Sequence, residues 1–165
     1  MAALAAFVAF LAPAPLQARP ALSWQVEDDT PHALRYGGPP TGRDDRDPGL
    51  YCAGQSLRVY FYLDAAHFRT RVARGDFVDA QGRFGPWPHR FVVTAGPRRA
   101  VMAGQVQIDR LPMASVTIAL NSPLYAAFAR SGQIRLSTLG QSSAFARLPP
   151  AMLAQVVRWC ASGDE

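Results

Sequence analysis

The sequence predicts a mainly β protein, an antiparallel β-sandwich or barrel with two short helices, one of them C-terminal. Apolar and polar residues alternate in many short runs, turn-forming Gly and Pro residues recur between the runs, and helical spacing occurs in only two stretches. About eight short strands separated by turns are typical of a sandwich or barrel. An α+β protein with a single open sheet is the alternative.

Residues 1–18 are expected to form an export signal. An apolar run from Ala2 to Leu11 is followed by the small-residue cleavage sequence Leu16-Gln17-Ala18. No Lys or Arg precedes the run, so a buried N-terminal helix is the alternative. The run is too short for a stable membrane span. Removing 18 of 165 residues leaves 147, residues 19–165, which suit a single β-rich domain in the periplasm or outside the cell.

Two short strands are expected to open the domain. The alternation of Leu22, Trp24 and Val26 with polar residues predicts the first, and residues 33–36 form the second. The segment from Gly37 to Gly49 contains no large apolar side chain, which predicts a mobile loop.

A β-hairpin follows this loop. Residues 50–53 and 57–64 are its strands, and Gly54 supplies the positive φ that the turn requires. Cys52 lies in the first strand, and the chain contains just one other cysteine, Cys160. In an exported chain such a pair predicts a disulfide, with two inert buried thiols as the alternative.

The middle of the chain is expected to be mostly sheet. Residues 65–73 suit a helical turn or a strand equally well. Four further strands are predicted from alternation and turn residues, at 90–95, 99–103, 105–111 and 113–121.

The first helix is predicted at residues 123–131. Ser122 suits the N-cap, Pro123 the first helical position, and Gly132 the left-handed residue after the end. Strands are expected at 134–138 and 143–148. A second helix begins at Pro149 and Pro150 and carries Cys160 inward, so that it packs over the sheet near Cys52.

The sequence contains no recognisable catalytic, metal or cofactor motif. His32, His67 and His89 each lack a second ligand at metal-binding spacing. Asp45-Arg46-Asp47 resembles the start of a calcium loop, but the arginine and the lack of a later acidic ligand favour a solvated loop. We therefore expect no catalytic residue, no metal and no cofactor.

Charge is distributed unevenly along the chain. Between residues 69 and 99 the count is seven arginines against Asp76 and Asp79, a balance of 7 minus 2, or plus five; these arginines are Arg69, Arg71, Arg74, Arg83, Arg90, Arg98 and Arg99. The same stretch holds Trp87, between Pro86 and Pro88, and His89. This pattern predicts a basic binding face, with an Arg-rich solubilising surface as the alternative. Trp87 suits an aromatic platform for a ligand or a plug at one end of the core.

The order of features resembles that of a loose set of small, uncharacterised periplasmic proteins of alphaproteobacteria. These features are the export signal, Trp24, Leu34-Arg35-Tyr36-Gly37, an acidic loop, Cys52, a Pro-capped helix and Trp159-Cys160. The resemblance implies the compartment and the disulfide. It implies no activity.

Together these observations favour a non-catalytic exported domain whose basic face binds an anionic envelope lipid, a glycan or an exported protein. Nucleic acid is disfavoured by the compartment, although the sequence pI is about 9.9. The alternative function is a hydrolase acting on an envelope polymer, with a site near Asp79, Trp87 and His89. An enzyme inhibitor is a third hypothesis. The oligomeric state stays open.

Overall fold

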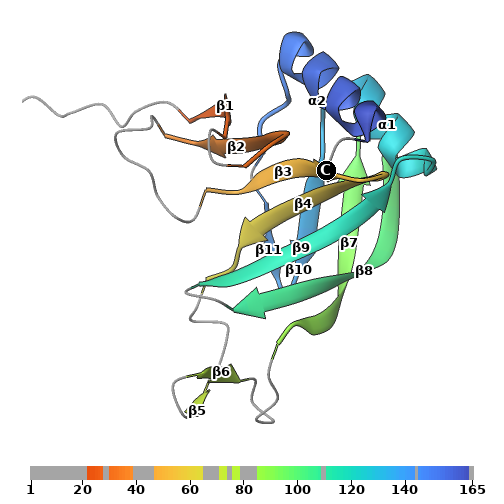
Figure 1. Ribbon diagram of the computed structural model, residues 1–165. Helices are drawn as coiled ribbons and strands as arrows, with labels where there is room; N and C mark the ends of the chain where they lie inside the picture. The colour runs from red at the N-terminus through yellow and green to blue at the C-terminus, as the bar shows by residue number, and fades with distance from the viewer. Residues whose placement is uncertain are drawn as a thin grey trace, which may run out of the picture.

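The computed structural model describes residues 22–27, 30–38, 47–64, 71–73, 76–78, 85–108, 111–143 and 145–163. Within these ranges, nine antiparallel strands form one sheet in the order β1-β2-β3-β4-β9-β8-β7-β10-β11, and β5 pairs with β6 as a separate ribbon (Figure 1). The strands are β1 (Ser23–Val26), β2 (Ala33–Gly37), β3 (Gly49–Ala53), β4 (Ser56–Tyr62), β5 (Arg71–Ala73), β6 (Asp76–Val78), β7 (Trp87–Ala95), β8 (Arg98–Ile108), β9 (Pro112–Ala119), β10 (Arg135–Thr138) and β11 (Gln141–Ser142). The mainly antiparallel β class is confirmed.

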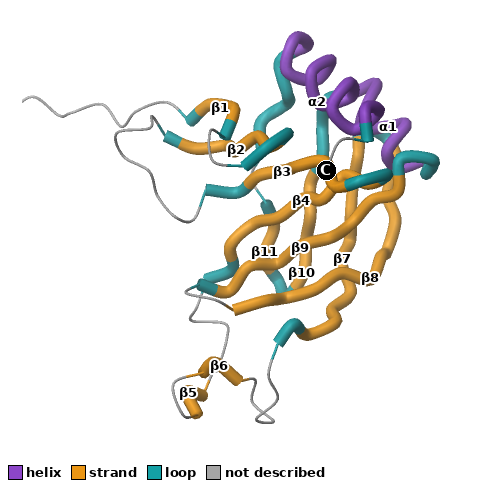
Figure 2. Tube along the Cα trace, viewed as in Figure 1, coloured by secondary structure: helices purple, strands orange, loops and turns teal. Residues whose placement is uncertain are grey.

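The large sheet curls into a half-barrel, and both helices lie at one end of it (Figures 1 and 2). Helix α1 (Pro123–Ser131) packs on β7, β8 and β9, whereas α2 (Pro150–Ser162) packs on β3. The curl brings β10 close to β4 across the interior. At this closure the backbone N–H of Asp64 donates to the side-chain oxygen of Gln141, 2.7 Å away.

The core follows the alternation expected from the sequence. In β4, Leu57, Val59 and Phe61 are buried while the residues between them are half-buried. The concave side of the sheet is filled further by Phe91 and by Phe128 of α1, both fully buried. β7 and β10 likewise carry one buried and one outward row, so their outward row remains available for contacts with other molecules.

The predicted hairpin and disulfide are both present. Gly54 has φ of +52° in the turn between β3 and β4. Cys52 and Cys160 form a disulfide with a Cα–Cα distance of 5.0 Å, which joins β3 to the last turns of α2. The bridge therefore attaches the C-terminal helix to the sheet, as predicted.

Helix α1 has the bounds that the sequence predicts, and α2 begins at Pro150, as predicted. The Ser122 hydroxyl accepts a hydrogen bond from the backbone N–H of Tyr125 at 3.2 Å, and Gly132 follows α1 with φ of +63°. Trp24 of β1 is buried, and its indole N–H donates to the carbonyl of Ala146 at 3.0 Å.

Two predicted strand boundaries are wrong. Residues 99–103 and 105–111 were expected to be separate strands, but β8 runs unbroken from Arg98 to Ile108. Gly104 continues the strand because the ring of Phe91 lies against it: a Cβ there would come within 2.5 Å of that ring. This glycine therefore provides space for a core side chain and does not end the strand.

The strand predicted at 143–148 is also absent from the described residues of that segment. Ser143 makes two local bonds: its hydroxyl accepts from the backbone N–H of Leu136, and its own N–H donates to the Leu136 carbonyl. Beyond it, Phe145 stacks on Trp24 with ring centroids 5.4 Å apart, and Leu148 donates to the Gly132 carbonyl. Contacts to separate elements thus replace a strand ladder.

Several predictions fall outside the described residues. These include the export signal at 1–18 and most of the loop between Gly37 and Gly49. Of residues 65–85, the short strands β5 and β6 and Gly85 are described. No helix among the described residues is long and apolar enough to cross a membrane.

Candidate functional site: a cationic face

Four exposed arginines gather where the β7–β8 turn meets the end of α1 and the start of β10. They are Arg98 and Arg99 of β8, Arg130 in the last turn of α1, and Arg135 of β10. Gly96 places the turn against α1, since a Cβ on it would lie 3.0 Å from Ser131. Gly132 then ends the helix and leads the chain into β10. Local turns and caps thus set the positions of all four side chains.

The sheet register places two of these arginines on the same outer row. Thr94 of β7 pairs with Arg99 on one side and with Arg135 on the other. Neighbouring strands lie about 4.8 Å apart, so the two arginine Cα atoms are about 10 Å apart on the convex face. We call the outer surface of β8, β7 and β10, together with Arg98 and Arg130 at its rim, the cationic face.

A second outer row lies beside the first. Val92 pairs with Val101 of β8 and with Ser137 of β10. Arg90 follows on the next outward position of β7 and is exposed. The cationic face therefore has an apolar centre, with Arg99 and Arg135 on one side and Arg90 on the other.

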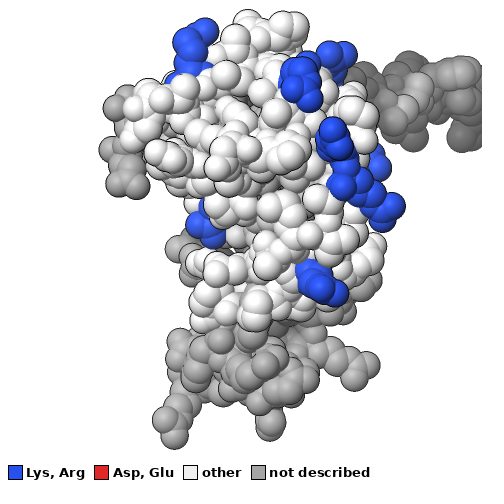
Figure 3. Space-filling view, turned by 90° about the vertical axis from the view of Figure 1, so that its right-hand side faces the viewer, with Lys and Arg blue, Asp and Glu red and all other residues white. Residues whose placement is uncertain are grey.

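The cationic face is not neutralised within the described part of the protein. No hydrogen bond or ion pair joins the side chains of Arg90, Arg98, Arg99, Arg130 or Arg135 to another residue there. Figure 3 views the side formed by α1, β7 and β8. Several arginines, drawn in blue, are exposed there, and no acidic side chain, which would be red, is visible among the described residues. Uncompensated guanidinium groups create a positive potential that attracts anions over about a Debye length.

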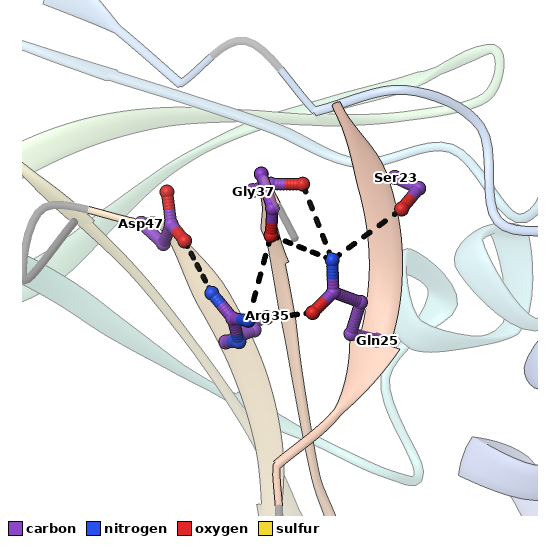
Figure 4. Close-up of polar contacts among 6 residues, drawn as sticks. Ser23, Gln25, Arg35, Gly37 and Asp47 are labelled. Carbon is purple, nitrogen blue, oxygen red and sulfur yellow. Dashed lines mark hydrogen bonds and ion pairs between the residues drawn. The ribbon is translucent and has the colours of Figure 1, made fainter. Parts of the chain in front are cut away.

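The acidic side chain of Asp47, in contrast, is paired on another part of the sheet. Its carboxylate accepts a hydrogen bond from Arg35 at 2.5 Å, and the Arg35 side chain is only 8% exposed (Figure 4). Arg35 also donates to the side-chain oxygen of Gln25, whose NH₂ group donates to the carbonyl of Gly38 at 2.7 Å. Asp47 was expected in a solvated loop; it is instead held by a buried cation, because the chain enters β3 directly beside β2, where the Tyr36 N–H donates to the Pro48 carbonyl at 2.8 Å. This cluster is structural.

Three tyrosine rings lie next to one another on the outer face of β3 and β4. The rings of Tyr51 and Tyr60 are 6.3 Å apart and tilted, and those of Tyr60 and Tyr62 are 6.2 Å apart and meet edge to face. The Arg58 guanidinium lies 5.8 Å from the centre of the Tyr51 ring and donates to the Ser115 hydroxyl. The rings are not coplanar, so they do not form a flat platform for a sugar.

A depression of about 470 Å³ lies next to the disulfide, at the opposite end of α2 from its prolines. Its polar lining groups are Gln55, Asn121 and Ser162. It contains no titratable side chain, because its one cysteine, Cys160, is bridged, and it does not include His89. Within the described residues, no three His, Cys, Asp or Glu side chains come together as a metal site.

The structure describes only some of the predicted binding residues. Arg90, Arg98 and Arg99 are exposed on or at the rim of the cationic face, whereas His89 is half-buried. Strand alternation places His89 on the Phe91 side of β7, opposite to Arg90. Arg69, Arg74, Arg83 and Asp79 lie outside the described residues, and only the backbone is described for Arg71 and Trp87.

Sequence reasoning missed Arg130 and Arg135. They lie more than thirty residues beyond Arg99 along the chain and join it only through the β7–β10 pairing and the contact of α1 with the turn. The one sequence signal for Arg130 was the predicted helix at 123–131, which ends at Gly132 and so places Arg130 in its last turn.

Comparison with protein-family models, with curated proteins and with solved structures finds no match to this chain. The cationic face, the disulfide and the fold are therefore the features from which a function can be argued.

Proposed function

We propose that the protein is a non-catalytic exported domain that binds an anionic component of the cell envelope through the cationic face. One observation carries the proposal: five exposed arginines have no acidic partner among the described residues. An exported protein with an acidic surface is the other partner that this face would suit. The predicted hydrolase function is not proposed here, because Asp79 and the side chain of Trp87 lie outside the described residues and no observation on the described residues favours it.

Three observations support export. The Cys52–Cys160 disulfide is typical of proteins that fold in an oxidising compartment. The predicted signal at residues 1–18 and the resemblance to periplasmic proteins point the same way. The compartment also determines which anions the protein can meet. Outside the cytoplasm these are lipid phosphates, acidic glycans and acidic proteins.

The binding strength should depend steeply on salt. Each arginine near an anionic surface contributes about 1 kcal/mol at physiological ionic strength. Five such side chains together contribute about 5 kcal/mol, a dissociation constant of about 0.2 mM, and this attraction should strengthen at low salt and weaken as the ionic strength rises.

The test is retention of the purified protein on a sulfated polysaccharide resin, a generic soluble polyanion. The Arg98→Glu/Arg99→Glu variant should elute at much lower salt than the wild type. The matched control is Arg147→Glu/Arg158→Glu, which changes the net charge equally at two exposed positions, one in the segment before α2 and one on α2. Equal elution of the two double variants would show that net charge, not the cationic face, causes retention, and the proposal would be withdrawn.

A further inference from the structure

The cationic face has an exposed apolar centre. Val101 is 64% exposed, and it pairs with Val92 of β7 in the row next to Arg99. A strand residue facing water is more often polar, because alternation separates the core from the solvent side. Two neighbouring valines on this side, surrounded by arginines, give the face an amphipathic character.

Leu139 adds a second exposed apolar group at the edge of this face. It occupies the β10–β11 turn with φ of +52°, before Gly140 with φ of +74°. Such turns favour Asn or Gly, and a leucine there is strained. Leu139 is also 43% exposed, so neither burial in the core nor the backbone conformation explains why a leucine occupies this position. The hydroxyl of Thr138 donates to the carbonyl of Arg90 at 2.9 Å, which places this turn beside Arg90.

The shape of the face favours an extended partner. It is the convex side of the curled sheet, and the depression that the structure describes lies elsewhere, beside the disulfide. Small ligands and single glycan chains bind in concave sites or grooves. A bilayer surface, in contrast, presents phosphates for arginines and an acyl boundary that accepts protruding apolar side chains.

We infer that the cationic face, with Val101 and Leu139, docks on the surface of an anionic phospholipid bilayer. This inference rests on the proposed function and names its partner. The arginines lie at the level of the lipid phosphates, and the two apolar side chains enter the interface between them. An acidic protein or glycan would need the arginines but would gain little from Leu139.

The Leu139→Asn variant separates docking from folding. Asparagine tolerates the left-handed conformation better than leucine, so this variant should be at least as heat-stable as the wild type. We expect it to bind about fivefold less well to phosphatidylcholine vesicles containing phosphatidylglycerol, measured by co-sedimentation. The matched control is Leu22→Asn, which removes a leucine that is 61% exposed beside β1, the edge strand at the other end of the sheet order.

The charge requirement is tested on the same vesicles. Arg99→Gln/Arg135→Gln should weaken binding about thirtyfold, whereas Arg147→Gln/Arg158→Gln should weaken it less. Vesicles of phosphatidylcholine alone should bind little of the wild type.

The outcomes distinguish the two proposals. If the protein is retained on the polysaccharide resin through Arg98 and Arg99 but does not bind the anionic vesicles, the bilayer inference is overturned and the proposed function stands. If it binds neither, both are overturned. If it binds the vesicles but Leu139→Asn behaves like Leu22→Asn, the docking surface is wrong. A selective loss with Leu139→Asn, at undiminished thermal stability, supports the inference.

Discussion

Removing the Cys52–Cys160 disulfide should lower the free energy of unfolding substantially. The two cysteines are 108 residues apart, so the bridge closes most of the domain into one loop. For a loop of this length the chain-entropy model gives about 5 kcal/mol, because the crosslink restricts the unfolded chain. Domains of this size are stable by about 5 to 15 kcal/mol, so the loss would be a large part of the total.

The perturbation is the double substitution Cys52→Ala/Cys160→Ala. Both cysteines are buried, and alanine adds no unsatisfied polar group while leaving a small void between β3 and α2. The assay is urea unfolding followed by tryptophan fluorescence and far-UV circular dichroism. Without the crosslink the unfolded state is more expanded, so the m-value should rise while the free energy of unfolding falls.

The reduced wild-type protein is the control, since it lacks the crosslink but keeps both sulfur atoms in place. It should resemble the double variant to within the small contribution of the void. A loss below about 1 kcal/mol with an unchanged m-value would refute the reasoning, because it would mean that the bridge does not restrict the unfolded chain.

Three further predictions concern the sheet and α1. Asp47→Asn should destabilise the protein by about 2 to 3 kcal/mol in urea unfolding, because it leaves the Arg35 charge buried without a counterion. Gly104→Ala should lower stability by about 2 to 3 kcal/mol in the same assay, since the new methyl group would collide with the Phe91 ring; an unchanged unfolding midpoint would contradict this packing. Burial raises the pKa of Tyr125 above its ordinary value of 10.0, so the unfolded chain should ionise first and the melting temperature should fall above that pH. Tyr125→Phe should reduce this fall, and an identical pH profile for the variant would argue against the assignment.

Local physics determined much of the fold. Side chains two residues apart share one face of a strand, so the buried row of β4 can be predicted from the positions of Leu57, Val59 and Phe61 alone. Caps act over three residues, so Ser122 and Gly132 delimit α1 without knowledge of the rest. Because the chain contains two cysteines, only one pairing within it is possible. The disulfide could therefore be predicted from the sequence once an oxidising compartment was expected.

The tertiary structure alone decided how distant segments meet, and with that the composition of the cationic face. Sequence cannot indicate that β7 pairs with β10, because antiparallel pairing between separated strands depends on the curl of the whole sheet. This pairing brings Arg135 to Arg99. The three-dimensional structure was also needed to show that the Phe91 ring lies against Gly104 and that Asp47 pairs with the buried Arg35 side chain. Local preferences act within a few residues, whereas the cationic face is assembled from segments that only the closed core holds together.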